Sequence, residues 1–570
     1  MRLPHAIKPN SECRTPKRIV ALSCETKTVQ TEHGKVASFA EATAVFGYRL
    51  GTGQWSEPLS LSFDDPAALW EEVAAFCRVR ARTWLCAHGL GNELRIARAF
   101  RCLPLLGFIA NPDVIVSDTT LSIGWHDAGG RSMQMVDLFS YLPAGMAEVR
   151  RRSRQFTDAQ AVFTAFRELI DLQHDFDLGN FSRTGASNAS NHFRHRHMTG
   201  RIYVHDDAKA LEAERESIFT GRTEAWRWGR FKYLDEWDLP LAYPRVGLDA
   251  PMPVRLLGLC PHGSPTTDNR RLGLVHALVK CDMPVLPKRD DAGGISWAVG
   301  TFTGWYWQPE LDLAVEHGAE VEPLEQYVYQ AAPVLQSWAQ WIIGSQTRAD
   351  LTPVQQLATK HWGRALVGKF GSQVPDWRDD AYFEGCDLEL CRETDERYGL
   401  GERLTVGGRS LVSFERRYAD NACPALMSRV ISECRMRLWK LMCVAGLEHV
   451  FYVDTDSLFL DRAGSERLRS HVERGESWGV RVKARHTSVT ILGPRQLVLS
   501  DGPKVAGMSK EARWNEEFQR YDVEARESFR GGASAGNVET VLTRSRSFRL
   551  RGVDHRRVHL PGGLTEARSA

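Results

Sequence analysis

Blocks of apolar and polar positions alternate along the chain in a way that predicts mixed α/β structure. Near the N-terminus, residues 18–23 form an apolar run of strand type, and residues 66–80 place apolar side chains at helical spacing. A second short strand at 84–87 precedes an expected helix at 92–101. Because strands and helices alternate here, we expect an α/β fold for this part of the chain.

The middle of the chain has one weakly patterned stretch and two helical patterns. Residues 150–200 are rich in Arg, Asn, Ser and His, so we expect a loop or connection there. Residues 323–371 have mainly helical spacing, with a break near Pro353. Residues 425–445 predict an amphipathic helix, because their apolar side chains recur on one face and Gly446 can end it.

Two apolar segments, 451–453 and 458–460, flank a polar tip and predict a β-hairpin. Asp454 and Asp456 in this tip are two residues apart, so in an extended chain their carboxylates project to the same side. Such a pair is costly unless a cation neutralises it, and Mg²⁺ prefers oxygen ligands. Two ions roughly 3.5–4 Å apart stabilise the attacking and leaving oxygens of a phosphoryl displacement. The alternative interpretation is an ordinary Asp- and Ser-rich turn.

Composition narrows the possible classes of protein. A chain of 570 residues usually forms three or more folding units. It contains no run of 18 apolar residues that would predict a membrane span, and residues 1–17 lack the apolar core of a secretory signal, so we expect a basic tail there. The twelve cysteines show no CxxC pair and no Cys/His metal spacing, which indicates reduced thiols rather than disulfides or a zinc site.

The net charge of +2 argues neither for nor against nucleic acid as a partner. Residues 543–563 are dense in arginine and poor in acids, so they could neutralise phosphates. The same segment is also explained by a solvated, arginine-rich surface.

The hairpin tip belongs to a segment that resembles a known family. Residues 451–457 (FYVDTDS) resemble motif C of family B DNA polymerases, which is written YxDTDS. Residues 238–244 (DLPLAYP) resemble motif A, DxxSLYP, with Leu241 and Ala242 in place of serine and leucine. Motif A precedes motif C in the family, as it does here.

Motif B lies between these two segments. Residues 360–371 (KHWGRALVGKFG) resemble KxxxNSxYG followed by KFG, but Arg364, Ala365 and Val367 depart from the usual Asn, Ser and Tyr. Two shorter segments agree with the same family. They are residues 219–225 (FTGRTEA), which resemble the YxGGR-type linker, and residues 495–508, which resemble the KxY and KxKG region.

The resemblance implies roles for the acidic residues. Asp238, Asp454 and Asp456 would be catalytic and would hold two Mg²⁺ ions, with Mn²⁺ as an alternative metal. The carbonyl of Leu239 would be a further ligand. The family resemblance also places Lys360 on the fingers, in contact with the incoming triphosphate.

Other positions acquire roles from the same resemblance. Tyr243 would pack under the sugar and exclude a ribose 2′-OH, although a core aromatic is the alternative. Arg348 would be a second triphosphate contact, with an ordinary surface arginine as the alternative. Arg495 and Lys504 would contact the primer terminus or DNA.

Family B enzymes also carry a proofreading exonuclease, whose motifs are altered here. The motif DxE corresponds to Ser23-Cys-Glu25, the motif HNxxxD ends at Glu93, and the motif YxxxD matches Tyr203 to Asp207. Because a serine hydroxyl cannot replace the charge of a bridging carboxylate, we expect weak or absent exonuclease activity. An error of register in placing these motifs is the alternative.

The resemblance implies an α/β multi-domain fold, with an N-terminal RNase H-like 3′–5′ exonuclease-type domain followed by a right-hand polymerase of palm, fingers and thumb. The expected divisions are a basic tail at 1–17, a degenerate exonuclease-like domain at 18–215, palm with an insertion at 216–335, fingers at 336–375, palm with motif C at 376–490 and thumb at 491–570.

The length is similar to that of the compact protein-primed branch found in phages and linear plasmids, where a terminal-protein hydroxyl replaces the primer 3′-OH. We therefore expect a cytoplasmic DNA-directed DNA polymerase that uses primer-template DNA and dNTPs, has no membrane partner and has a terminal protein as a further partner. Two other hypotheses remain. The departures in motif B suggest a catalytically weak polymerase fold that binds nucleic acid, whereas a nuclease acting through the N-terminal domain is opposed by Ser23.

Overall fold

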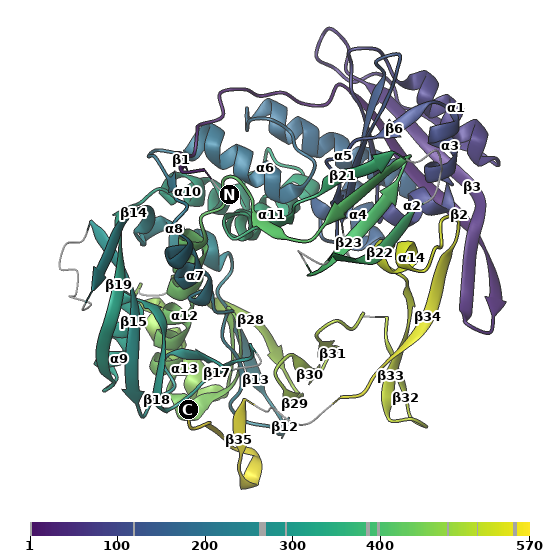
Figure 1. Cartoon of the computed structure of the whole chain (residues 1–570). Helices are drawn as coiled ribbons and strands as arrows, with labels where there is room; N and C mark the ends of the chain where they lie inside the picture. The colour runs from purple at the N-terminus through teal and green to yellow at the C-terminus, as the bar shows by residue number, and fades with distance from the viewer. Residues whose placement is uncertain are drawn as a thin grey trace.

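Strands and helices are mixed throughout the chain, as Figure 1 shows for this computed structural model. The structure describes residues 3–117, 120–261, 270–290, 293–382, 388–395, 399–475, 478–509, 511–550 and 556–570. No helix in these ranges is long and apolar enough to cross a membrane. The arginine-rich segment expected at 543–563 lies partly outside the described residues.

The N-terminal half is built on one large sheet, called here the N-terminal sheet. Its central strands run in the order β3-β2-β5-β9-β8-β6, and β2 pairs parallel with β5, which pairs parallel with β9. The bounds are β2 (Arg18–Thr31), β3 (Gly34–Tyr48), β5 (Thr83–Ala87), β6 (Phe108–Ala110), β8 (Leu121–Asp127) and β9 (Ser132–Asp137). The strands expected at 18–23 and 84–87 are thereby confirmed.

Alternating side chains of β2 place this sheet between two layers of helices. Ile19 packs into the buried cluster that contains α5 (Asp158–Asp175), whereas its neighbour Val20 packs into the cluster that contains α1 (Pro66–Phe76). The helix expected at 92–101 is two helices, α2 (Leu90–Ile96) and α3 (Ala99–Leu105), because Arg98 between them is left-handed with φ 53°.

The expectation of a loop at 150–200 is wrong. Thr157 caps the N-terminus of α5 by accepting a hydrogen bond from the Gln160 amide, and α5 buries an apolar face that includes Phe166 and Ile170. Two shorter helices flank α5 in the sequence. They are α4 (Met146–Ser153) before it and α6 (Gly185–His192) after it. The abundant Arg, Asn and His residues obscured this helical periodicity.

A second antiparallel sheet has the order β14-β19-β15-β18. Its bounds are β14 (Met252–Pro261), β15 (Arg271–Cys281), β18 (Gly300–Trp307) and β19 (Glu320–Ala332). Residues 323–332, which were expected to be helical, belong to β19, so the helical part of 323–371 begins only at Gln336. It consists of α10 (Gln336–Ser345) and α11 (Pro353–Phe370), separated near the proline that was expected to interrupt it.

The central sheet has the order β11-β26-β27-β13-β28. Its bounds are β11 (Thr223–Ala225), β13 (Leu234–Asp238), β26 (Val450–Asp454), β27 (Ser457–Leu460) and β28 (Arg481–His486). The amphipathic helix expected at 425–445 is confirmed as α12 (Pro424–Ala445), which ends at Gly446 with φ 86°.

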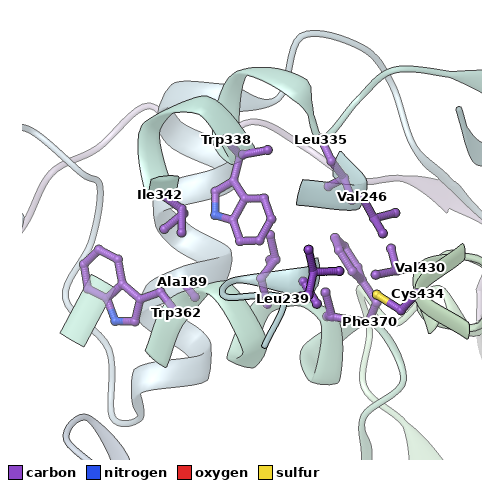
Figure 2. Close-up of a cluster of buried hydrophobic side chains, with 14 of the residues drawn as sticks. Ala189, Leu239, Val246, Leu335, Trp338, Ile342, Trp362, Phe370, Val430 and Cys434 are labelled. Carbon is purple, nitrogen blue, oxygen red and sulfur yellow. The ribbon is translucent and has the colours of Figure 1, made fainter. Parts of the chain in front are cut away.

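Helices α10, α11 and α12 share one buried core beside the central sheet (Figure 2). Trp338 of α10, Phe370 of α11 and Val430 of α12 lie in this core together with Leu239, which follows β13 directly. The core thus joins the expected fingers helix to the strand that carries Asp238, and it fixes their relative position.

Residues 376–418 extend the N-terminal half. The sheet β21-β24-β23-β22 buries Leu390, Leu404 and Leu411 in the same cluster as the outer face of the N-terminal sheet. Its bounds are β21 (Arg378–Tyr382), β22 (Glu389–Asp395), β23 (Gly399–Val406) and β24 (Arg409–Ser413). These residues were expected to belong to a palm at 376–490.

The described C-terminal residues lie in three places. Strand β29 pairs with β12 and is followed in the same sheet by β30 and β31, whereas strands β32 to β34 join the N-terminal sheet beside β3, as Figure 1 shows. The hairpin β35–β36 contacts β11 and the residues after it, because Arg557 pairs with Glu224 and Leu564 bridges to Arg227. The bounds are β12 (Gly229–Phe231), β29 (Val489–Gly493), β30 (Gln496–Leu499), β31 (Gly502–Val505), β32 (Arg513–Asn515), β33 (Arg520–Arg526), β34 (Val541–Phe548), β35 (Arg557–His559) and β36 (Thr565–Ala567). The division into domains, including a thumb at 491–570, stays a prediction.

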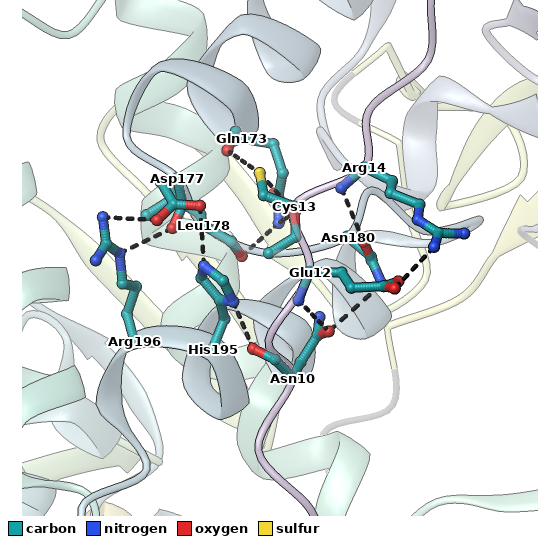
Figure 3. A network of polar contacts seen from close by, with 11 residues as sticks. Asn10, Glu12, Cys13, Arg14, Gln173, Asp177, Leu178, Asn180, His195 and Arg196 are labelled. Atoms are coloured by element: carbon teal, nitrogen blue, oxygen red, sulfur yellow. Dashed lines mark hydrogen bonds and ion pairs between the residues drawn. The ribbon is translucent and has the colours of Figure 1, made fainter.

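The expected basic tail is tied to the body of the protein over its described part. His5 and Ala6 form β1, which pairs with β10 (Tyr203–Val204). Figure 3 shows the next contacts, in which His195 binds the Asn10 carbonyl and Asp177 while the Cys13 thiol donates to the Gln173 carbonyl. Polar side chains rather than basic charge therefore hold this segment in place.

Candidate active site

The polar tip between β26 and β27 is a hairpin, as the sequence predicts. Asp454 pairs with Ser457, and Thr455 at the turn is left-handed with φ 62°. On the other side of β27, Asp238 at the end of β13 also pairs with Ser457. Three carboxylates from two separate segments therefore meet at one end of the central sheet.

Backbone hydrogen bonds fix this tip to its neighbours. The Leu239 amide donates to the Asp456 carbonyl at 2.8 Å, and the Thr455 amide donates to the Arg222 carbonyl at 2.6 Å. The Thr223 hydroxyl donates to Asp454 Oδ1 at 3.1 Å. The two aspartate segments are consequently held together by the main chain, independent of any bound ion.

The carboxylates repel one another. Burial, together with the nearby charges of Asp238 and Asp454, raises the pKa of Asp456 to about 6, while Lys483 acts in the opposite direction. Within the described residues, no group of three or more His, Cys, Asp or Glu side chains forms a ready-made metal cage. The donor chemistry nevertheless fits Mg²⁺, which is usually held by one or two carboxylates together with substrate phosphates.

Tyr243 lies between the carboxylates and helix α11. It stands near the start of α8 (Ala242–Asp249) and packs partly against the buried core. Burial, with Cys434 and Asp456, raises its pKa to about 12, and Arg364 acts in the opposite direction. The ring is therefore partly a core aromatic, while its protonated hydroxyl lies in the field of Asp456.

Helix α11 presents two cations on one exposed face. Lys360 and Arg364 are one turn apart and both exposed, whereas Gly363 between them is buried. A Cβ added at Gly363 would lie 3.0 Å from Pro244 Cγ, so this turn of α11 rests directly on the segment that follows Asp238. The motif B departure at Arg364 thus places a charge beside Tyr243.

Arg348 has a different environment. It lies between α10 and α11, where its guanidinium forms two hydrogen bonds with Asp350, at 2.9 and 2.6 Å, and stacks 4.7 Å from the Phe176 ring centroid. These contacts favour the interpretation of a surface arginine over that of a triphosphate contact.

The two positions expected to bind primer or DNA also differ from each other. Arg495 occupies the turn between β29 and β30, and its backbone amide donates to the Tyr452 hydroxyl at 2.7 Å. The Lys504 ammonium binds Glu236 Oε1 at 3.3 Å. Lys504 therefore lies beside β13, which carries Asp238, whereas Arg495 lies beside β26, which carries Asp454.

The first two exonuclease-type motifs come together in the N-terminal sheet. Ser23 and Glu25 are on β2, and the Cys24 amide between them donates to Glu93 Oε2 of α2 at 2.6 Å. Burial raises the pKa of Glu93 to about 7, although the Cys24 amide favours its charged form.

The third motif is not where the sequence suggested. Tyr203 lies in β10 next to the N-terminal segment, and Asp207 caps α7 (Ala208–Glu216) by accepting a hydrogen bond from the Ala210 amide at 3.0 Å. The carboxylate that acts on the pKa of Glu93 is Asp158, the first residue of α5. Asp158 follows the capping Thr157, so its sequence signal was that of a helix start rather than of a catalytic motif.

Comparison with protein families finds a match over part of the chain. Residues 157–384, less than half of the chain, match the family model described as DNA polymerase type B, organellar and viral. The matched range contains the motif A and motif B segments, while the motif C hairpin lies beyond it. A comparison with curated protein sequences finds no match.

The fold of this chain is similar to that of phi29 DNA polymerase. A structure of phi29 DNA polymerase with primer-template DNA is 14% identical, covers 94% of this chain and 100% of the phi29 chain, and has a TM-score of 0.65. The complex that also contains incoming nucleotides has the same values, and the complex with single-stranded DNA has a TM-score of 0.64. At this identity the likeness concerns the fold, and it confirms the expected multi-domain α/β fold class.

Two residues close to these sites escaped sequence reasoning. Asp158 was missed because an aspartate after a capping threonine is ordinary at the start of a helix. Lys483 was missed because it belongs to no motif and approaches Asp456 only through strand pairing. The sequence signal that could have indicated it is the alternation of basic residues along β28, where Arg481, Lys483 and Arg485 occupy every second position.

Proposed function

We propose that this protein is a family B DNA polymerase that extends a primer 3′-OH on a DNA template by two-metal transfer of dNMP from dNTPs. The match of residues 157–384 to the type B polymerase family model and the likeness of fold to phi29 DNA polymerase support this proposal. The observation that carries this proposal is the meeting of Asp238, Asp454 and Asp456, with Asp456 held at a raised pKa by burial and by the other two carboxylates. Such an arrangement is unfavourable by itself, which supports a role in binding divalent cations.

Asp238, Asp454 and Asp456 would hold Mg²⁺, or Mn²⁺ in its place, with the Leu239 carbonyl as a further candidate ligand. When bound, the metal supplies Lewis-acid stabilisation of the attacking and leaving oxygens. The chain itself contributes a rigid carboxylate pair, because the Leu239 amide holds the Asp456 carbonyl and the Thr223 hydroxyl holds Asp454.

The dNTP would lie between this tip and the exposed face of α11. Lys360 on that face would neutralise triphosphate charge, as a lysine does in phosphoryl transfer. Tyr243 would pack beneath the sugar, where its ring leaves no room for a 2′-OH. Its position between α11 and Asp456 supports this role.

Proofreading is proposed to be weak or lost. Ser23 occupies the position of the first aspartate of the motif DxE, whereas Glu25 and Glu93 retain carboxylates beside it. The loss of one negative charge and one ligand weakens binding of a metal pair.

Protein-primed initiation is proposed as the priming mode, in the cytoplasm of a bacterial or other host cell. It is supported by the compact length and by the likeness of fold to phi29 DNA polymerase. In that mode a hydroxyl of a terminal protein would take the position of the primer 3′-OH.

A primer-extension assay with Mg²⁺, dNTPs and a labelled primed template tests the proposal. We expect extension by the wild-type protein and a loss of at least about 10³-fold in Asp238→Asn, as for removal of an essential catalytic group. Lengthening of the primer supports the polymerase. Binding without extension would support the alternative of a catalytically weak nucleic-acid-binding protein, which the altered motif B favours. Shortening of the primer would contradict the proposed loss of proofreading.

A further inference from the structure

Strand β28 is the outermost strand beside β13 in the central sheet, and it contains a β-bulge. Glu236 pairs with Ala484, but the next residue, Trp237, pairs with Val482, so Lys483 is an extra residue with no partner in the ladder. A bulge re-aims the side chain of its extra residue and occurs often next to active sites. Here it turns Lys483 toward the face of β13 that carries Glu236 and Asp238.

A buried carboxylate anchors the ammonium of Lys483. Glu236 is 3% exposed, and its Oε1 lies 2.8 Å from Lys483 Nζ and 3.3 Å from Lys504 Nζ. Its Oε2 lies 3.2 Å from His486 Nε2. Glu236 therefore holds two lysines at one edge of the catalytic end of the sheet.

The Lys483 ammonium also lies in the field of the catalytic carboxylates. Burial disfavours its charge, but Glu236, Asp238 and Asp456 together raise its pKa. Its side chain is 48% exposed, so the ammonium can reach ligands in solvent as well as these residues.

We propose that Lys483 is a resident counter-cation of the polymerase site. In the free protein it neutralises part of the charge that Asp238 and Asp456 present to divalent cations, and in the DNA complex it binds a phosphate of the primer strand near the 3′ end. This inference rests on the proposed function. It has two consequences of opposite sign, because one positive charge repels metal ions and attracts phosphate.

The test compares Lys483→Met with wild type in two binding measurements. The first is the thermal shift of the DNA-free protein during titration with Mn²⁺, where we expect the midpoint concentration to fall roughly 5- to 10-fold in Lys483→Met. The second is fluorescence anisotropy with labelled primer-template in EDTA, where we expect Kd to rise about 3- to 10-fold and the salt slope to decrease by about one.

Matched variants separate charge from structure. Lys280→Met removes another strand lysine that is paired with a glutamate, Glu320, at 2.9 Å, and it should leave both measurements unchanged. Lys483→Arg keeps the charge and should behave as wild type in both. Lys483→Gln is measured in parallel, so that a folding defect of the methionine variant does not decide the result.

Opposite shifts in the two measurements support the proposal. Unchanged values in Lys483→Met and Lys483→Gln, or shifts that share one direction, would overturn it. Failure of the proposed function is a separate outcome, because wild-type protein would then neither extend a primer nor bind primer-template, whereas failure of this inference leaves wild-type extension intact.

Discussion

Replacing Asp456 with asparagine is expected to make the DNA-free protein more stable while abolishing catalysis. Burial and two neighbouring carboxylates raise the pKa of Asp456 from an ordinary value of 3.8 to about 6. A shift of about two units corresponds to about 3 kcal/mol, since each unit is worth about 1.4 kcal/mol. The asparagine side chain has the same shape and carries no charge, so Asp456→Asn removes this cost.

The sign of the pH dependence follows from the direction of the shift. Because the folded protein holds the Asp456 proton more tightly than the unfolded chain does, its stability falls as pH rises through the interval between the two pKa values. The full cost applies above pH of about 6, and none applies well below the ordinary value. We therefore expect Asp456→Asn to be more stable than wild type by up to about 3 kcal/mol at pH 7.5, with no difference near pH 3.5.

Urea unfolding in EDTA at several pH values measures this difference. Asp282→Asn, at an exposed aspartate, is the control and should show no such pH-dependent gain. Addition of Mg²⁺ should stabilise wild type more than Asp456→Asn, because only wild type retains the complete carboxylate set. A variant that is equally stable or less stable than wild type at pH 7.5 would refute the reasoning.

Three further variants test other parts of the structure. Ser23→Asp should raise 3′–5′ shortening of a labelled primer at least about 10-fold, because loss of even outer-shell partners of a metal costs 10–100-fold, and no gain would argue against the proposed exonuclease defect. Arg364→Gln should raise the KM for dNTPs on the order of 10-fold in steady-state extension, as for the loss of a charge-assisted hydrogen bond, and an unchanged KM would remove Arg364 from the nucleotide site. Arg557→Met should lower the free energy of unfolding by roughly 3–5 kcal/mol in urea titrations, because it takes one of two arginine partners from the buried Glu224; a loss below 1 kcal/mol would contradict that view.

Local patterns predicted the centre of the site well. The hairpin around Asp454 and Asp456 follows from two short apolar runs around a polar tip, and helix 425–445 follows from its apolar periodicity. Both signals are contained within about twenty neighbouring residues, where periodicity reports directly on burial. The order of the motifs predicted that Asp238 would lie beside the tip. In the structure, the pairing of β13 with β27 places it there.

Features that depend on distant strand pairing were not predictable in this way. The bulge that directs Lys483 toward Glu236 exists because β28 and β13 pair with a shifted register, which no local pattern encodes. The same holds for β34, whose partner β3 is about 500 residues earlier in the chain. Asp158 was missed for a different reason, since a threonine and an aspartate in sequence are ordinary at the start of a helix.

Single-nucleotide addition most directly tests the central claim, that Asp238, Asp454 and Asp456 form a template-directed polymerase site. Four primed templates differ in the templating base, and each is incubated with Mg²⁺ and one dNTP at a time. We expect wild-type protein to add the complementary nucleotide on each template, and Asp456→Asn to bind the same DNA without adding any. Addition that ignores the template, or addition by Asp456→Asn at the wild-type rate, would contradict the claim.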